Sequence, residues 1–259
     1  MPDSVYQLGK LPKQDDDRNL MLAKYVTPAA PTPPAAVDYA AAVKAWGMLG
    51  NDTVGDCALA GQAHADMLWA ANAEHRQLAI TTAMVLRAYS DVTGYDPRDD
   101  GPGGNPTDRG TTLLDALKYW RTRGIDRQTV KAFVEVDAQS VENAKLAIDL
   151  FGCLYVGVEL PDAVLPDSPG DLPAWTVPPD GTPHHKPNPH NGHCVVYAAY
   201  DAAGPTVVTW GTTVKASWGF HTAYCDELYA LLSPVWLRHD PPGIDVATLT
   251  ADLELVARH

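Results

Sequence analysis

The two halves of the chain carry different patterns of apolar residues, and this difference is the strongest constraint on its fold. In the first half, apolar residues recur at helical spacing over 57–75, 80–90 and 111–124. After residue 131, short runs rich in Val, Tyr and Thr are typical of strands. No segment repeats along the chain. Helices followed by strands predict an α+β fold whose two halves face each other.

The second half is expected to contain strands with helices between them. Strands are predicted at 131–136, 153–160, 193–201 and 205–211, a helix at 141–152, and a mixed strand and helix segment at 215–233. The helix at 111–124 ends on a glycine, which is typical of a helix C-terminus.

The chain is long enough for one large domain preceded by an arm. Residues 1–36 are polar and then proline-rich, which indicates an extended arm that wraps the surface. Residues 37–259 are expected to form a single domain. Within it, we place a helical half at about 37–128, a β-rich half at about 129–240 and a C-terminal tail at 241–259.

The charge of the chain argues against nucleic-acid binding. Its 32 acidic and 19 basic residues give a formal net charge of −13, and no stretch gathers Lys and Arg on one face. Such a surface repels phosphate backbones. A basic or neutral substrate approaches it more easily.

The sequence lacks the signals of a membrane or exported protein. Its first twenty residues have neither the basic start nor the apolar core of a secretory signal. No apolar run reaches the length of a membrane-spanning helix. The four cysteines are too few for a disulfide scaffold. We therefore expect a cytoplasmic protein with mostly reduced thiols, with a Cys153–Cys194 bridge as the alternative.

Cys57 stands where a reactive cysteine belongs, at the first position of a predicted helix. The positive end of the helix dipole favours the thiolate, which is the nucleophilic form. Gly55 lets the backbone turn just before it. Asp56 acts in the other direction, because its negative charge raises the thiol pKa. A buried structural cysteine is the alternative interpretation.

His193 is the candidate partner base. It follows a flexible Asn191-Gly192 pair and opens a predicted strand, so its imidazole is expected at the rim of the sheet. That position suits a general base. A structural or merely exposed histidine is the alternative.

Over about residues 36–235, these motifs resemble the papain-like cysteine peptidases. In that family a cysteine opens the long helix of the first half and a histidine opens a strand of the second half. Here Cys57 and His193 are 136 residues apart, which is similar to the family's separation. The resemblance implies a papain-like fold with a central Cys-bearing helix facing an antiparallel β half. It also implies that Asn51, six residues before Cys57, takes the place of the family's oxyanion-binding glutamine.

Two further matches fall in the family's order. Gly110-Thr111 resembles the glycine pair that borders the family's substrate cleft. Thr209-Trp210 followed by glycine lies where the family has Asn-Ser-Trp-Gly, so the resemblance implies that Trp210 shields the histidine, with simple core packing as the alternative. The family's orienting asparagine is replaced by Val208.

Because valine cannot hydrogen-bond an imidazole, another group must orient His193. A hydroxyl of Thr209, Thr212 or Thr213 or a backbone carbonyl could do so; otherwise the site is a Cys–His dyad.

Two loops invite a metal interpretation that we do not adopt. The proline-rich loop 161–192 ends in the tract HHKPNPHNGH, which lacks the helical spacing of a zinc site and is expected to be a mobile lid. The acidic loop 91–108 lacks the ordered alternation of a calcium loop and is expected to be solvated. We expect no metal and no cofactor.

The sequence thus predicts a cysteine peptidase or amidase that cleaves an amide bond through Cys57 and His193. Its partner is a peptide or amide substrate, without nucleic acid or membrane insertion. One alternative is a weakly active or inactive papain-fold protein used for binding within a phage particle or protein assembly, which the Val208 departure favours. The chain also resembles uncharacterised actinobacterial and phage proteins, a resemblance that implies no substrate. A papain-fold acyltransferase is the third possibility.

Overall fold

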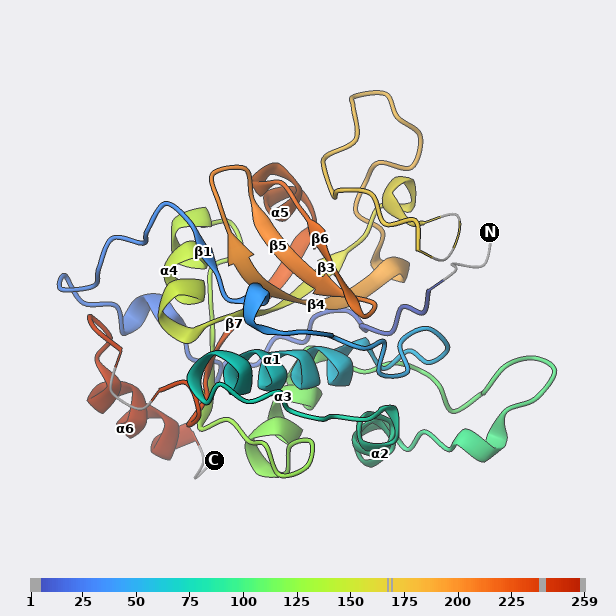
Figure 1. The fold of residues 1–259 in the computed structure, drawn as a ribbon, viewed down its shortest axis with the longest axis horizontal. Helices are drawn as coiled ribbons and strands as arrows, with labels where there is room; N and C mark the ends of the chain where they lie inside the picture. The colour runs from blue at the N-terminus through green and yellow to red at the C-terminus, as the bar shows by residue number, and fades with distance from the viewer. Residues whose placement is uncertain (1–5, 167, 169, 238–240, 257–259) are drawn as a thin grey trace.

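An antiparallel sheet separates two groups of helices (Figure 1). The computed structural model describes residues 6–166, 168, 170–237 and 241–256. Among these residues the sheet has seven strands, with six in the order β2-β7-β3-β4-β5-β6 and β1 paired to β4. The strands are β1 (Val37–Asp38), β2 (Ala132–Glu135), β3 (Leu154–Glu159), β4 (Gly192–Tyr200), β5 (Pro205–Thr209), β6 (Thr212–Lys215) and β7 (Cys225–Leu232).

The helices of the first half lie together on one face of the sheet, and α4 and α5 lie on the other (Figure 1). The α-helices are α1 (Cys57–Ala73), α2 (Thr82–Thr93), α3 (Leu113–Thr122), α4 (Val141–Phe151), α5 (Trp218–Tyr224) and α6 (Val246–Val256). Short 3₁₀ turns are η1 (Leu22–Lys24), η2 (Ala40–Ala42), η3 (Pro97–Asp99), η4 (Asp162–Val164) and η5 (Pro189–Asn191). None of the helices in the described part of the chain could cross a membrane.

The central strands are buried on both faces. Along β4, Val195 and Tyr197 enter the core beneath α4 and α5, while Val196 and Ala198 enter the core beneath α1. Successive side chains of a strand point to opposite faces, so a strand covered twice must be apolar at nearly every position. This explains why β4 reads as a continuous apolar run rather than as an alternating one.

Helix α1 is buried on every side except at its C-terminal end. A helix enclosed in this way needs apolar or satisfied polar side chains all round. Its Gln62 amide donates to the Ala116 carbonyl, and His64 lies 3.1 Å from the Gly47 carbonyl oxygen. Gly61 lets the helix approach the sheet closely, and the Tyr155 hydroxyl of β3 donates to the Ala58 carbonyl at 2.7 Å.

The α+β class is confirmed, and the main differences from expectation lie at turns and termini. The strand predicted at 205–211 ends at Thr209, because Trp210 and Gly211 both take positive φ and form the two-residue turn to β6. The expected tail at 241–259 forms α6, although its last residues, 257–259, lie outside the described residues.

The arm is extended but does not simply wrap the surface. Its residues 1–5 lie outside the described residues, and Tyr6, Lys10, Leu22 and Tyr25 are buried. The Tyr25 hydroxyl donates to Asp252, so a hydrogen bond joins the arm to helix α6. The arm is therefore part of the packed structure.

The close approach at Gly61 yields a test of the α1–sheet contact. A Cβ there would lie 3.0 Å from the Tyr155 ring and 3.2 Å from the Cys194 sulfur. We expect Gly61→Val to lower the free energy of unfolding by about 1–3 kcal/mol through overpacking. Gly219→Val, at an exposed position of α5, is the matched control and should change the free energy of unfolding by less than about 0.5 kcal/mol. Urea unfolding measures both, and equal effects would contradict the close contact.

Candidate active site

Cys57 begins α1 after a tight turn. The Thr53 and Val54 N–H groups donate to the Gly50 carbonyl, and the Asp56 carbonyl then accepts the first bonds of the helix. Because the turn reverses the chain directly before the helix, the Cys57 side chain lies at the helix N-terminus, next to unpaired N–H groups.

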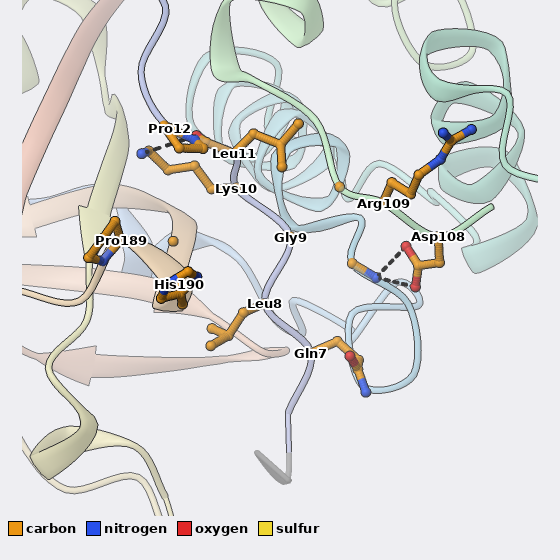
Figure 2. Close-up of a pocket in the computed structure, with 13 residues that line it drawn as sticks. Gln7, Leu8, Gly9, Lys10, Leu11, Pro12, Asp108, Arg109, Pro189 and His190 are labelled. Atoms are coloured by element: carbon orange, nitrogen blue, oxygen red, sulfur yellow. Dashed lines mark hydrogen bonds between the residues drawn. The ribbon is translucent and has the colours of Figure 1, made fainter. Parts of the chain in front are cut away.

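Asp108 anchors this turn to the loop that follows α2. Its carboxylate accepts from the Gly55 N–H at 3.0 and 3.2 Å (dashed lines in Figure 2) and from the Tyr89 hydroxyl at 2.6 Å. The Tyr89 oxygen in turn accepts from the Gly110 N–H at 2.8 Å. Two backbone segments that border the site, at Gly55 and Gly110, are thus held by one buried tyrosine and one carboxylate.

His193 is fixed at the start of β4 by two neighbours. Its Nε2 lies 2.8 Å from the Thr209 hydroxyl oxygen, and its ring stacks on the Trp210 indole with centroids 4.3 Å apart. Its Nδ1 is buried and makes no hydrogen bond with the described residues. One ring nitrogen is therefore positioned by a hydroxyl, and the other remains available for proton transfer.

The β5–β6 turn supplies both neighbours. Thr209 pairs with Thr212 across a two-residue turn, in which Trp210 has φ 41° and Gly211 has φ 70°. Positive φ at both central positions matches the twist of a hairpin. This turn presents the Trp210 indole to His193, and the hydroxyl next to the imidazole comes from the residue after Val208.

The sulfur of Cys57 and the start of β4 come together across the two halves. The backbone N–H groups of Cys194 and Gly9 lie near the sulfur and act to lower its pKa, against the larger effect of burial. Cys194 follows His193 directly on β4, so the candidate nucleophile lies beside the strand end that carries the candidate base.

Residues 7–12 of the arm lie in the groove between the two halves (Figure 2). On one side, the Lys10 N–H donates to the Gly192 carbonyl at 3.1 Å. On the other, the Thr111 N–H donates to the Gly9 carbonyl at 2.9 Å, and the Leu11 N–H donates to the Thr111 carbonyl at 3.0 Å. The arm is thus held from both walls by backbone groups.

Glycines make this close approach feasible. A Cβ at Gly9 would overlap the Gly55 carbonyl, one at Gly110 would overlap the Gly9 carbonyl, and one at Gly192 would overlap the Lys10 carbonyl. Gly110 also has φ 70°, which side chains rarely allow. The groove therefore accepts an extended backbone directly against its walls. Beside the arm it leaves a cavity of about 580 Å³ that reaches Arg109 and His190.

Burial under the arm keeps both candidate groups neutral. Cys57 and His193 are each about 1% exposed. Loss of hydration raises the pKa of the Cys57 thiol to about 11, with Asp56 adding to the rise, and lowers the pKa of His193 to about 3. A thiol and a neutral imidazole are the stable forms here, so the covered site lacks the thiolate that acts as a nucleophile.

Asp56 is an unusual neighbour for a nucleophile. Its carboxylate oxygens are buried without a hydrogen bond of good geometry to the described residues. Burial, together with the charge of Asp108, raises its pKa well above the usual value. As predicted from the sequence, the charge of Asp56 raises the pKa of the Cys57 thiol.

Asn51 is placed differently from a free oxyanion donor. It is buried, and its amide nitrogen donates to the Val54 carbonyl at 3.1 Å and to the Gln7 carbonyl of the arm at 3.3 Å. The Trp210 indole N–H donates to the same Gln7 oxygen at 3.3 Å. Asn51 therefore binds a peptide carbonyl in the groove, that of Gln7. This carbonyl belongs to a residue two positions before Gly9, whose N–H lies near the Cys57 sulfur.

The other predicted residues also gather here, and three contributors were not predicted. Gly110, Thr111, Thr209 and Trp210 all border the groove or His193. Asp108 was assigned to a solvated loop, and Gly9 and Lys10 to a surface arm. No sequence pattern distinguishes them, because their partners are distant in the chain. Among the described residues, no three His, Cys, Asp or Glu side chains cluster as metal ligands, and all four cysteines are free thiols.

The comparisons with known proteins identify the fold. No protein-family model and no curated protein matches the sequence. The structure is similar to xylellain, a cysteine protease from Xylella fastidiosa, at 12% identity and a TM-score of 0.67, covering 90% of this chain and 98% of that one. It also resembles digestive procathepsin L 3 of Tenebrio molitor, at 14% identity and a TM-score of 0.57, covering 86% and 75% of the two chains.

A third similar structure is the proform of Amb a 11, a cysteine protease and ragweed pollen allergen, at 14% identity and a TM-score of 0.58, covering 89% of this chain and 69% of that one. The chain therefore has the papain-like fold, with Cys57 in the helix that faces the β half.

Displacing the arm should expose Cys57. Gly9→Val introduces side-chain atoms where the Gly55 carbonyl lies, so it destabilises the docked arm. We expect iodoacetamide to label Cys57 at least about tenfold faster in this variant than in the wild-type chain, because labelling of a buried thiol requires local opening. Mass spectrometry of the adducts gives the rates. Cys153 and Cys225 are internal controls, and acceleration at all three would indicate general unfolding instead.

Asp56→Asn should stabilise the protein as pH rises. A raised carboxyl pKa means that the folded state resists ionisation, so the carboxyl destabilises the fold above its unfolded pKa of about 3.9 and not below it. We expect the variant to unfold at a higher temperature than the wild type at pH 8, with a smaller difference at pH 4.

The matched control for this variant is Asp52→Asn, which removes the same charge from an exposed position. A pH-dependent gain as large in this control as in Asp56→Asn would contradict the role of burial.

Proposed function

We propose that this chain is a cysteine-dependent hydrolase that cleaves a peptide or amide bond, with Cys57 as nucleophile and His193 as general base and acid. One observation carries the proposal. Cys57, at the N-terminus of α1, lies next to the start of β4, where His193 has its Nε2 2.8 Å from the Thr209 hydroxyl oxygen, and the groove beside them already contains an extended peptide. The likeness in fold to cysteine proteases supports the same reaction class.

The reaction begins once the arm has left and water has reached the site. Rehydration removes the main cause of both pKa shifts, so the Cys57 proton can pass to His193. The thiolate attacks the substrate carbonyl carbon, and the negative charge moves to the carbonyl oxygen. His193 then protonates the leaving amine as the C–N bond breaks, which leaves a thioester. Water, deprotonated by His193, releases the acid and restores the thiol.

Two donors are available to the oxyanion. The first is the backbone N–H of Cys57, which lies in the first turn of α1 and has no helical partner. The second is the Asn51 amide, which loses the Gln7 carbonyl when the arm leaves. A donor that exchanges one peptide carbonyl for another needs little rearrangement, which supports its assignment to the oxyanion.

In this conformation the docked arm is not placed as a substrate of Cys57. Gly9 presents an N–H, rather than a carbonyl carbon, to the Cys57 sulfur. The nucleophile therefore meets a hydrogen-bond donor. Two of the similar structures are proforms, procathepsin L 3 and Amb a 11.

The binding-protein alternative rests on the same burial. Cys57 and His193 are both held in neutral forms beneath the arm, and such a pair catalyses nothing while it stays covered. If the arm never leaves, the chain is a papain-fold binding protein. If it leaves and an amine outcompetes water for the thioester, the chain is an acyltransferase.

Peptide hydrolysis distinguishes these functions. In both the wild-type chain and Gly9→Val, we expect Cys57→Ala to abolish hydrolysis of a fluorogenic peptide library and His193→Ala to lower kcat/KM by about 10²–10⁴. Thr209→Val should lower it by about tenfold by releasing His193 Nε2, and Thr209→Ser should restore it.

Selective labelling of Cys57 that falls in His193→Ala would accompany activity. Activity that survives Cys57→Ala, or an accessible Cys57 that labels no faster than Cys225, would overturn the proposal. A free amine added to the assay identifies acyl transfer as a new amide product.

A further inference from the structure

Among residues 7–12 of the arm, the charged side chain that contacts the groove wall is Lys10. Its side chain is 1% exposed, and its ammonium lies 2.5 Å from the Asp226 carboxylate and 3.4 Å from that of Glu227. The other contacts of Gly9, Lys10 and Leu11 described above are made by backbone atoms. The backbone contacts of Lys10 and Leu11 do not depend on their side chains, whereas the position of Gly9 has no room for a side chain and the Lys10 side-chain contact selects for a cation.

The space that Lys10 occupies is built into the sheet. Gly157 of β3 forms one wall, and a Cβ there would overlap the Lys10 side chain and the Glu227 side chain. The Tyr229 hydroxyl donates to Glu227 Oε2 at 3.0 Å, which leaves Oε1 facing the ammonium. The result is a narrow pocket with two carboxylates at its end and no side chain blocking its wall.

The pocket lies one residue along the arm from the candidate nucleophile. The Gly9 N–H lies near the Cys57 sulfur, where it acts to lower the thiol pKa, and Lys10 is the next residue. A peptide that follows the same backbone contacts therefore brings a side chain into this pocket while its main chain passes the sulfur.

An empty pocket would be electrostatically unfavourable. Burial acts to lower the pKa of Lys10, but Glu227 and Asp226 outweigh it, and the net pKa is raised. Burial raises the pKa of Glu227 to about 7, although Lys10 opposes the rise. Removing the cation leaves two adjacent carboxylates, one of them fully buried, which is costly unless another cation enters.

We propose that the pocket formed by Gly157, Asp226 and Glu227 is a specificity site that binds a lysine or arginine side chain of the substrate, and that Lys10 occupies it as an internal stand-in. This assignment rests on the proposed function, which it deepens by naming the substrate class. It agrees with the net charge of −13, which attracts basic peptides.

The pocket itself can be tested without catalysis. In full-length Lys10→Ala, we expect n-butylammonium to raise the thermal unfolding midpoint more than tetramethylammonium at equal ionic strength, because only the former is slender enough to place an ammonium at the carboxylates. The apparent affinity for n-butylammonium should be at least about tenfold greater than in Lys10→Ala/Asp226→Asn/Glu227→Gln.

Equal shifts with the two salts in Lys10→Ala would overturn the cation site. If this variant folds poorly, the yield of refolded protein in each salt provides the same comparison. A higher yield in n-butylammonium supports the cation site, and equal yields overturn it.

The substrate role is tested with peptides that carry lysine or its uncharged analogue norleucine at successive positions around the cleaved bond. At one position, we expect the lysine peptide to have a kcat/KM at least about tenfold higher than the norleucine peptide. In Asp226→Asn/Glu227→Gln, this ratio of the two kcat/KM values should fall to near one. A ratio unchanged by these substitutions would overturn the assignment. If no peptide is cleaved at all, the proposed function fails, and the n-butylammonium comparison still decides whether the pocket binds a cation.

Discussion

The packing of α1 against β3 and β4 is the contact on which the rest of the structure depends. The helix is enclosed by the sheet, α2 and α3, and it approaches β3 closely because Gly61 has no side chain and Tyr155 bonds to its first turn. This contact brings the N-terminus of α1 to the start of β4. The Cys57 sulfur consequently meets the backbone of Cys194, and a groove opens between the two halves where they diverge.

The same geometry explains why the arm can enter. A groove whose walls are backbone at Gly110, Thr111 and Gly192 offers hydrogen bonds to an extended backbone, provided that the residue at the position of Gly9 has no side chain. The arm takes these bonds and removes water from Cys57 and His193. Water loss, rather than a specific inhibitory contact, then holds both groups neutral. Under the proposed function, such a site is controlled by access, and departure of the arm makes its chemistry available through rehydration.

Much of the architecture could be predicted from sequence patterns, and the errors have physical causes. Helices α2 to α4 follow from apolar periodicity, because each buries one face. Helix α1 and the central strands are buried all round and follow instead from the length of their apolar runs. The end of β5 was missed because Trp210 adopts positive φ, a conformation that its residue type does not favour. Asp108 was read as a solvated side chain, although Tyr89 and Gly55 hold it in place. Such partners are invisible in a single sequence, because they depend on how the loops pack.

The sequence by itself determined the α+β class, the position of Cys57 at a helix start and that of His193 at a strand start, because these features depend on residues that are close together in the chain. Only the tertiary structure decided that Thr209 orients the imidazole, that residues 7–12 fill the groove and that Lys10 meets Asp226 and Glu227. Each of these contacts joins segments far apart in sequence. Their formation depends on the docking of the two halves, which no local pattern encodes.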